Sequence, residues 1–168
     1  TGIAHRELRP TLGILDPAAL TSMPPLVVAA NAFDVFSHAI ESLTAIPYTE
    51  RAAPERSGLR PMYQGANPYS DIACSEAIQL IGANIERAMK DPDDLSAREP
   101  LMFAGMLAGI GFGNSGCHVP HAMSYAVAGL VRDYHPEGWP DDHAMVPHGI
   151  SVIVNAPAVF RLIGPSAA

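Results

Sequence analysis

An apolar run with a helical period, interrupted by one acid and one histidine, constrains the fold of this chain more than any other segment. In residues 27–43 the apolar side chains recur nearer to every 3.6 than to every second position, and Pro24–Pro25 precede them. The segment therefore predicts a helix that ends near Pro47. Asp34 and His38 lie four residues apart, so they occupy one face of that helix. Such a pair is either half of a metal site or a side-chain hydrogen bond on a solvated face.

Two later segments offer further imidazoles. His118 and His121 follow a glycine-rich stretch that begins at Gly109, and His148 lies in a Pro-His-Gly turn that would hold its ring at the start of a helix. The carboxylate and imidazole of the first helix, joined by two of these imidazoles, can close on one divalent metal. Such ligands suit Fe(II), Zn(II), Mn(II), Co(II) or Ni(II), and ligand type does not choose among them.

Several passages carry a family resemblance; they are residues 11–17, 33–42, 60–68, 108–114 and 146–149. They resemble the iron-containing alcohol dehydrogenases, whose metal pattern is Asp-x-x-x-His, then His, then Pro-His-Gly. The amino-acid sequence of these passages is most similar to one branch of the family, the hydroxyacid-oxoacid transhydrogenases. The metal ligands that the resemblance implies are Asp34, His38, His121 and His148.

The resemblance also separates the two neighbouring histidines. In the family the ligand is followed by Gly or Ala and then by Met, which favours His121 over His118. His118 is then either a catalytic neighbour that orders the pocket or a packing residue. Many dehydrogenases of the family carry a further histidine four positions after this ligand, where this chain has Tyr125. That tyrosine is either a catalytic group that hydrogen-bonds a substrate oxygen or a half-buried helix residue.

A long loop over residues 48–65 is expected to be a lid or an insertion. Arg51, Arg56 and Arg60 lie in it, and guanidinium groups match carboxylates in geometry. Arg60 is the candidate that would bind an acid substrate. The alternative is that all three are solvated loop arginines.

The expected fold class is mainly α. The resemblance implies a fragment of the helical, metal-binding C-terminal domain of a dehydroquinate synthase-like, iron alcohol dehydrogenase fold. Residues 1–22 are expected to end an α/β nucleotide-binding domain, with a short strand at 11–15. Residues 23–168 are expected to form the helical domain, incomplete at its C-terminus. The chain has no Gly-x-Gly-x-x-Gly after a strand, so residues that bind NAD(P) stay unknown.

Three further helices are predicted beyond the first. Asn67 and Pro68 have the residue types of an N-cap and a first helical position, so a helix is expected from there to Lys90. Asp93 or Asp94 should cap the next helix, whose apolar stretch at 101–110 predicts a fully buried core helix. The histidine-bearing segment, residues 116–130, predicts another.

The resemblance implies an enzyme that transfers hydride between a hydroxyacid such as 4-hydroxybutyrate and a 2-oxo acid such as 2-oxoglutarate through bound NAD. Fe(II), with Zn(II) as a substitute, would be the Lewis acid. One alternative is an NAD(P)-dependent iron alcohol dehydrogenase acting on primary alcohols. Another class is a non-catalytic helical module, and the isolated fragment is expected to be inactive.

Composition excludes other classes of partner. The net charge of −7 argues against nucleic acid. The apolar stretch at 101–110 is shorter than the roughly 20 residues that a membrane helix needs, so no membrane is expected. Cys74 and Cys117 do not form a Cys-x-x-Cys and predict reduced thiols. We therefore expect a cytoplasmic protein, or a mitochondrial one in a eukaryote, with small acids as partners; a homo-oligomer is left open.

Overall fold

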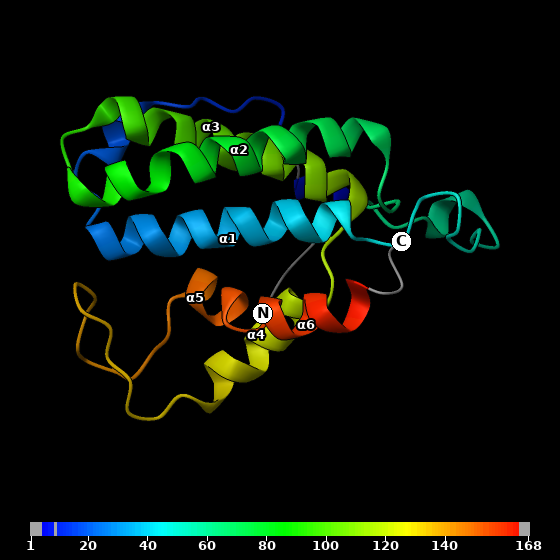
Figure 1. Cartoon of the computed structure of the whole chain (residues 1–168). Coiled ribbons are helices and arrows are strands. Elements are labelled where there is room, and N and C mark those ends of the chain that lie inside the picture. Colours follow the sequence, from blue (N-terminus) through cyan, green and yellow to red (C-terminus); the bar gives the residue numbers. More distant parts are fainter. Residues whose placement is uncertain (1–4, 9, 165–168) are drawn as a thin grey trace.

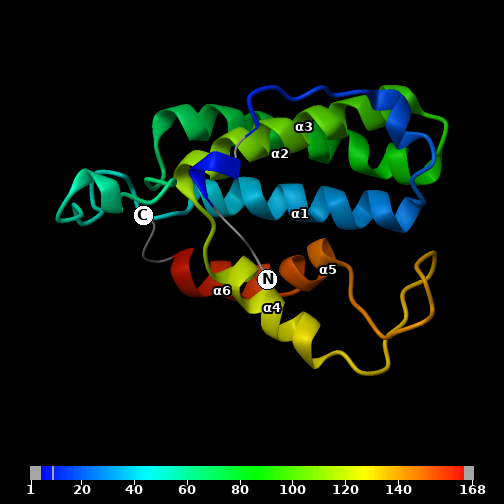
Figure 2. The same ribbon diagram turned by 180° about the vertical axis from the view of Figure 1, so that it is seen from behind.

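The computed structural model describes residues 5–8 and 10–164, and its regular structure within them is helical. One long helix runs through the middle, two long helices lie on one side of it, and three shorter helices lie on the other (Figure 1). The view from behind has the same three layers (Figure 2). The α-helices of the described residues are α1 (Pro25–Leu43), α2 (Pro68–Lys90), α3 (Leu95–Ser115), α4 (Val119–Leu130), α5 (His148–Ile153) and α6 (Ala156–Ile163).

The helices begin where the capping residues predict. The Asn67 side chain accepts a hydrogen bond from the Ser70 amide at 3.0 Å, with Pro68 at the first position of α2. Asp94, rather than Asp93, caps α3 by accepting from the Ala97 amide at 3.0 Å. These two predictions are confirmed. Histidines 135 and 143 lie in the exposed loop between α4 and α5.

The prediction of a short strand at residues 11–15 is wrong. In the described part of the chain this stretch is irregular, and Leu12 and Ile14 are 77% and 87% exposed. A strand needs a neighbour to bond its backbone, and none lies beside this stretch in the region described. Residues 1–4, 9 and 165–168, which belong to the ends of the two expected domains, lie outside the described residues. The division at residues 22 and 23 stays a prediction.

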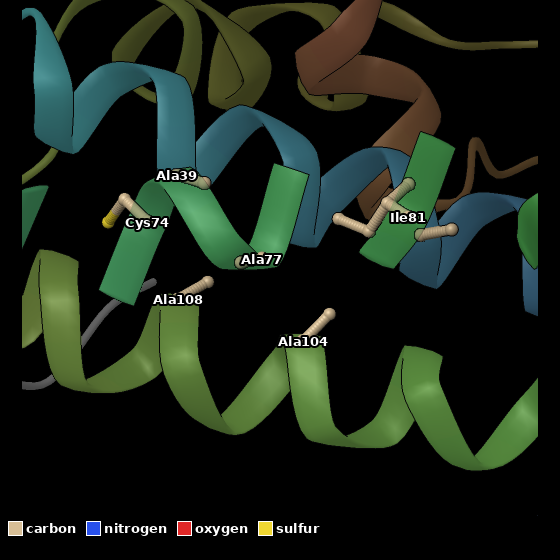
Figure 3. Packing of buried hydrophobic residues seen from close by; sticks show 7 residues of the cluster. Ala39, Cys74, Ala77, Ile81, Ala104 and Ala108 are labelled. Carbon is tan, nitrogen blue, oxygen red and sulfur yellow. The ribbon is translucent and has the colours of Figure 1, made fainter. Parts of the chain in front are cut away.

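Small side chains let the three long helices approach one another closely. The core between them is built mainly of alanines, with Cys74 and Ile81 among them (Figure 3). Ala39 of α1, Ala77 of α2 and Ala108 of α3 are at most 1% exposed. By length and composition alone α1 would suffice to cross a membrane, but it is the central helix of this bundle and packs on both layers.

The prediction of a fully buried α3 is wrong. Ala104 and Ala108 are buried, whereas Phe103 on the same helix is 45% exposed. The helix lies at the edge of the bundle, so α1 and α2 cover only one of its faces. Apolar residues on every face of this helix therefore do not mean that every face is buried.

A buried arginine holds the segment that leads into α1. Arg98 of α3 is 1% exposed, and its guanidinium donates to the carbonyl oxygens of Leu20 and Met23. These two carbonyls belong to the residues just before α1. The contact fixes where α1 begins relative to α3.

Gly149 lets α5 approach α1 at the point where Asp34 lies. A Cβ at Gly149 would stand 1.8 Å from the Ala30 carbonyl oxygen and 2.9 Å from the Asp34 amide nitrogen. Neither backbone atom can give way without moving α1. The absence of a side chain at this position therefore sets the spacing of the two helices, and with it the place of His148.

We predict that Gly149→Ala destabilises the fold by about 1–3 kcal/mol, because overpacking against the α1 backbone forces the helices apart. Chemical denaturation measures this change. Gly82→Ala is the matched control, since a Cβ at Gly82 meets nothing within 4 Å in the interior of α2. The control should gain about 0.5–1 kcal/mol. Equal stability of the two variants would contradict the close packing of α5 on α1.

Candidate metal centre

One face of α1 supplies three chemically active side chains. Asp34, His38 and Glu41 lie at positions i, i+4 and i+7, which fall on one stripe of a helix. Asp34 and His38 are partly buried, and Glu41 is 0% exposed. All three side chains contact histidines of the layer that holds α4 and α5.

The other layer contributes two imidazoles. His121 lies in the first turn of α4, where Gly116, with a φ of +102°, allows the chain to leave α3 and turn back. His148 is the first residue of α5 and follows Pro147. Both predicted imidazoles therefore sit at helix beginnings, and Gly149 brings the second of them up to α1.

The four predicted ligands converge on the Asp34 carboxylate. Asp34 Oδ1 lies 3.3 Å from His121 Nε2 and 3.5 Å from His148 Nε2, and Oδ2 lies 3.5 Å from His38 Nε2. We call these four residues the Asp34 cluster. The side chain of His148 is 51% exposed, so the cluster opens to solvent on the side of α5.

The ring of His38 is held on both faces. It stacks on Phe112 of α3 with centroids 4.0 Å apart and on His121 with centroids 4.1 Å apart. Its Nδ1 lies 3.2 Å from the Cys117 sulfur. Burial, followed by the charges of Glu41 and Asp34, raises the pKa of the Cys117 thiol above its usual range. The thiol is therefore neutral.

Charge is strongly coupled within the cluster. Burial acts to raise the pKa of Asp34, but hydrogen bonds from His121 and His38 and the charges of His38 and His148 outweigh it and hold that pKa well below its usual range. Burial likewise acts to lower the pKa of His121, yet its bonds to Asp34 and Glu41 raise that pKa to about 9. Without a metal, a proton on His121 balances the carboxylates.

The donor set fits a divalent transition metal. The ligand atoms of Asp34, His121 and His148 all lie within 4.8 Å of one another, and so do those of His38, His121 and Cys117. An ion with bonds of roughly 2.0–2.2 Å can be shared by donor atoms up to about 4 Å apart. The separations of 3.3 and 3.5 Å around Asp34 lie within that reach.

Three other predicted site residues do not join the cluster. His118 Nε2 lies 2.8 Å from Thr44 Oγ1, whose hydrogen is already donated to the Ile40 carbonyl, so His118 donates this bond. Tyr125 is 56% exposed, and Arg60 is exposed in the loop after α1. Within the described residues no side-chain hydrogen bond or ion pair joins any of the three to the cluster. Their catalytic and substrate-binding roles stay predictions.

Sequence reasoning missed Glu41. Its Oε1 accepts from His121 Nδ1 at 2.6 Å, and its Oε2 accepts from the His118 amide at 2.6 Å. The signal was present, because Glu41 follows His38 by three residues and so extends the same helical stripe. The spacing of Asp34, His38 and Glu41 places an acid one turn beyond the predicted ligand pair, on the same face of the helix.

These observations describe a helical domain with a candidate metal site, and the comparisons with known proteins agree with that fold. The model of the Fe-containing alcohol dehydrogenase family, C-terminal, matches residues 62–167. This match covers most of the chain. The chain belongs to the Fe-containing alcohol dehydrogenase family, as its sequence passages predict.

Individual relatives point to one branch. The mitochondrial hydroxyacid-oxoacid transhydrogenase of Mus musculus is 50% identical over 161 residues, which are 95% of this chain and 35% of that protein. The protein of the same name from Homo sapiens is 47% identical over 160 residues, 95% of this chain and 34% of that protein. The chain thus spans about a third of the length of the curated relatives that it matches.

Solved structures share the fold. The iron-containing alcohol dehydrogenase of Thermococcus thioreducens superposes with a TM-score of 0.73 at 27% identity, covering 97% of this chain and 34% of that one. A 1,3-propanediol oxidoreductase superposes with a TM-score of 0.66 at 29% identity, covering 88% of this chain and 30% of that one. The predicted fold class, a helical C-terminal domain of the iron alcohol dehydrogenase fold, is confirmed.

We predict that the metal-free chain loses stability as the pH rises toward 9. The folded pKa of His121, about 9, lies above its ordinary value of 6.5. Its contribution is therefore complete below pH 6.5 and is lost as the pH passes through about 9, a change on the order of 3 kcal/mol. Urea denaturation between pH 6 and 9.5 with a chelator present measures it.

The control for this pH dependence is a pair of variants. His121→Gln should abolish it, whereas His143→Gln, in the exposed loop outside the cluster, should leave it unchanged. A pH dependence that survives in the His121 variant would contradict the coupling of this imidazole to Asp34 and Glu41.

Proposed function

We propose that this chain is the metal-binding part of a hydroxyacid-oxoacid transhydrogenase. The observation that carries the proposal is the approach of His38, His121 and His148, from three helices, to the carboxylate of Asp34. Identity of about half to relatives of that name supports the particular reaction. In this proposal residues 23–168 form the metal domain, and residues 1–22 end the nucleotide-binding domain.

The Asp34 cluster would hold Fe(II), with Zn(II) as the second candidate. Family membership supports iron, and the carboxylate with three imidazoles suits either ion. A divalent ion bound there supplies Lewis acidity toward an oxygen of the substrate. NAD(P) would be bound by the remainder of the enzyme, and the structure of a sulfoacetaldehyde reductase with the same fold was determined in complex with NAD+.

The residues of this chain prepare the site in three ways. Asp34 gathers the imidazoles, because its two oxygens face all three rings. Phe112 and His121 clamp the ring of His38 from both faces, which excludes water from them. The exposed side at His148 leaves an approach for a small hydroxyacid or 2-oxo acid. Because the relatives are named as mitochondrial, the mitochondrion is the proposed compartment if this protein is eukaryotic.

The test is hydride transfer by the protein extended to the length of its relatives. With 4-hydroxybutyrate deuterated at the reacting carbon and 2-oxoglutarate, we expect deuterium to appear in the 2-hydroxy product without added NAD+. Asp34→Asn should reduce transfer to background, because the cluster loses a charge that balances the ion. His143→Gln, outside the cluster, is the control and should retain activity.

The same assay separates the alternatives. Release of NADH to solution with primary alcohols, and no transfer between the two acids, would contradict the transhydrogenase and support an NAD(P)-dependent alcohol dehydrogenase. The solved structures of alcohol dehydrogenases with this fold favour that second candidate. Full transfer activity in the Asp34 variant would contradict the metal site itself.

A further inference from the structure

Glu41 is a fully buried acid with a partner at each oxygen. It is 0% exposed, its Oε1 lies 2.6 Å from His121 Nδ1, and its Oε2 lies 2.6 Å from the His118 amide nitrogen. A carboxylate in such a place carries a large desolvation penalty unless charged or polar partners offset it. Its position therefore needs an explanation beyond packing.

We infer that Glu41 is a positioning residue that fixes the ring orientation and tautomer of His121, so that Nε2 faces the metal. This inference rests on the proposed metal site. A carboxylate that accepts from Nδ1–H leaves the lone pair of the neutral ring on Nε2. That nitrogen is the one that points at Asp34, 3.3 Å away.

Glu41 also fixes the helix that carries His121. The His118 amide, which Oε2 accepts from, belongs to the residue just before α4, and the positive end of a helix dipole favours a carboxylate there. Packing between α1 and α4 is otherwise sparse. One side chain of α1 thus sets both the start of α4 and the direction of the imidazole in its first turn.

Charge balance agrees with this role. Asp34 and Glu41 together carry two negative charges, and both contact His121. A divalent ion bound by neutral imidazoles beside these two carboxylates gives a cluster with no net charge. Without Glu41 the same ion would leave a buried positive charge uncompensated.

The experiment measures Zn(II) affinity of the 168-residue chain by competition with a chromophoric chelator. Glu41→Leu keeps most of the volume and removes the acceptor, so affinity should fall 10- to 100-fold. Glu41→Gln keeps an oxygen that can accept from Nδ1–H and should recover part of this loss. Thr44→Val is the control: it removes the other polar tie to His118 without touching His121, and its affinity should match the unchanged chain.

A second measurement needs no variant. Long-range 1H–15N spectra of the Zn(II)-loaded chain should show His121 protonated at Nδ1 and metal-bound at Nε2; the reverse would overturn the inference. Equal Zn(II) affinity in a folded Glu41→Leu chain would overturn it too, as would an equal loss in Thr44→Val, which would show a purely structural role. If the unchanged chain binds no Zn(II), the proposed metal site fails, and this inference fails with it.

Discussion

The contact on which the rest of this structure depends is that of one carboxylate with three imidazoles. Asp34 meets His38 of its own helix, His121 of α4 and His148 of α5, at 3.3 to 3.5 Å. Small side chains and Gly149 let the helices approach one another, and larger apolar side chains such as Phe36 and Leu107 fill the spaces between the long helices. The polar cluster, together with Glu41, supplies specific contacts between α1 and the layer that holds α4 and α5.

In the metal-free state of such a site, the protonation of the imidazoles balances the charge of the carboxylates. Asp34 stays ionised because its imidazole partners outweigh the cost of burial, and His121 retains a proton to about pH 9 for the corresponding reason. A metal that binds at neutral pH must displace that proton, so binding and protonation compete for one nitrogen. Glu41 has an acceptor role in both states, since it contacts the opposite nitrogen of the ring.

Local chemistry in the sequence predicts the helix beginnings and the residues that gather at Asp34. Asn67 and Asp94 predict where their helices begin, because an N-cap bonds a backbone amide only a few residues away in the sequence. His148 was found because a proline and a glycine flank it. The strand at residues 11–15 and the full burial of α3 failed because both depend on neighbours distant in sequence, and periodicity carries no information about them. Glu41 extends the helical stripe of Asp34 and His38, but it was missed because its partners His118 and His121 lie about 80 residues away in the sequence.

The most direct test of the account is the metal content of the chain purified under anaerobic conditions, compared with the double variant Asp34→Ala/His121→Ala and with His118→Ala. The account predicts roughly one divalent ion per chain, lost in the double variant and kept in His118→Ala, because His118 is bonded to Thr44 outside the cluster. A folded chain without metal, or loss of metal in His118→Ala alone, would contradict it.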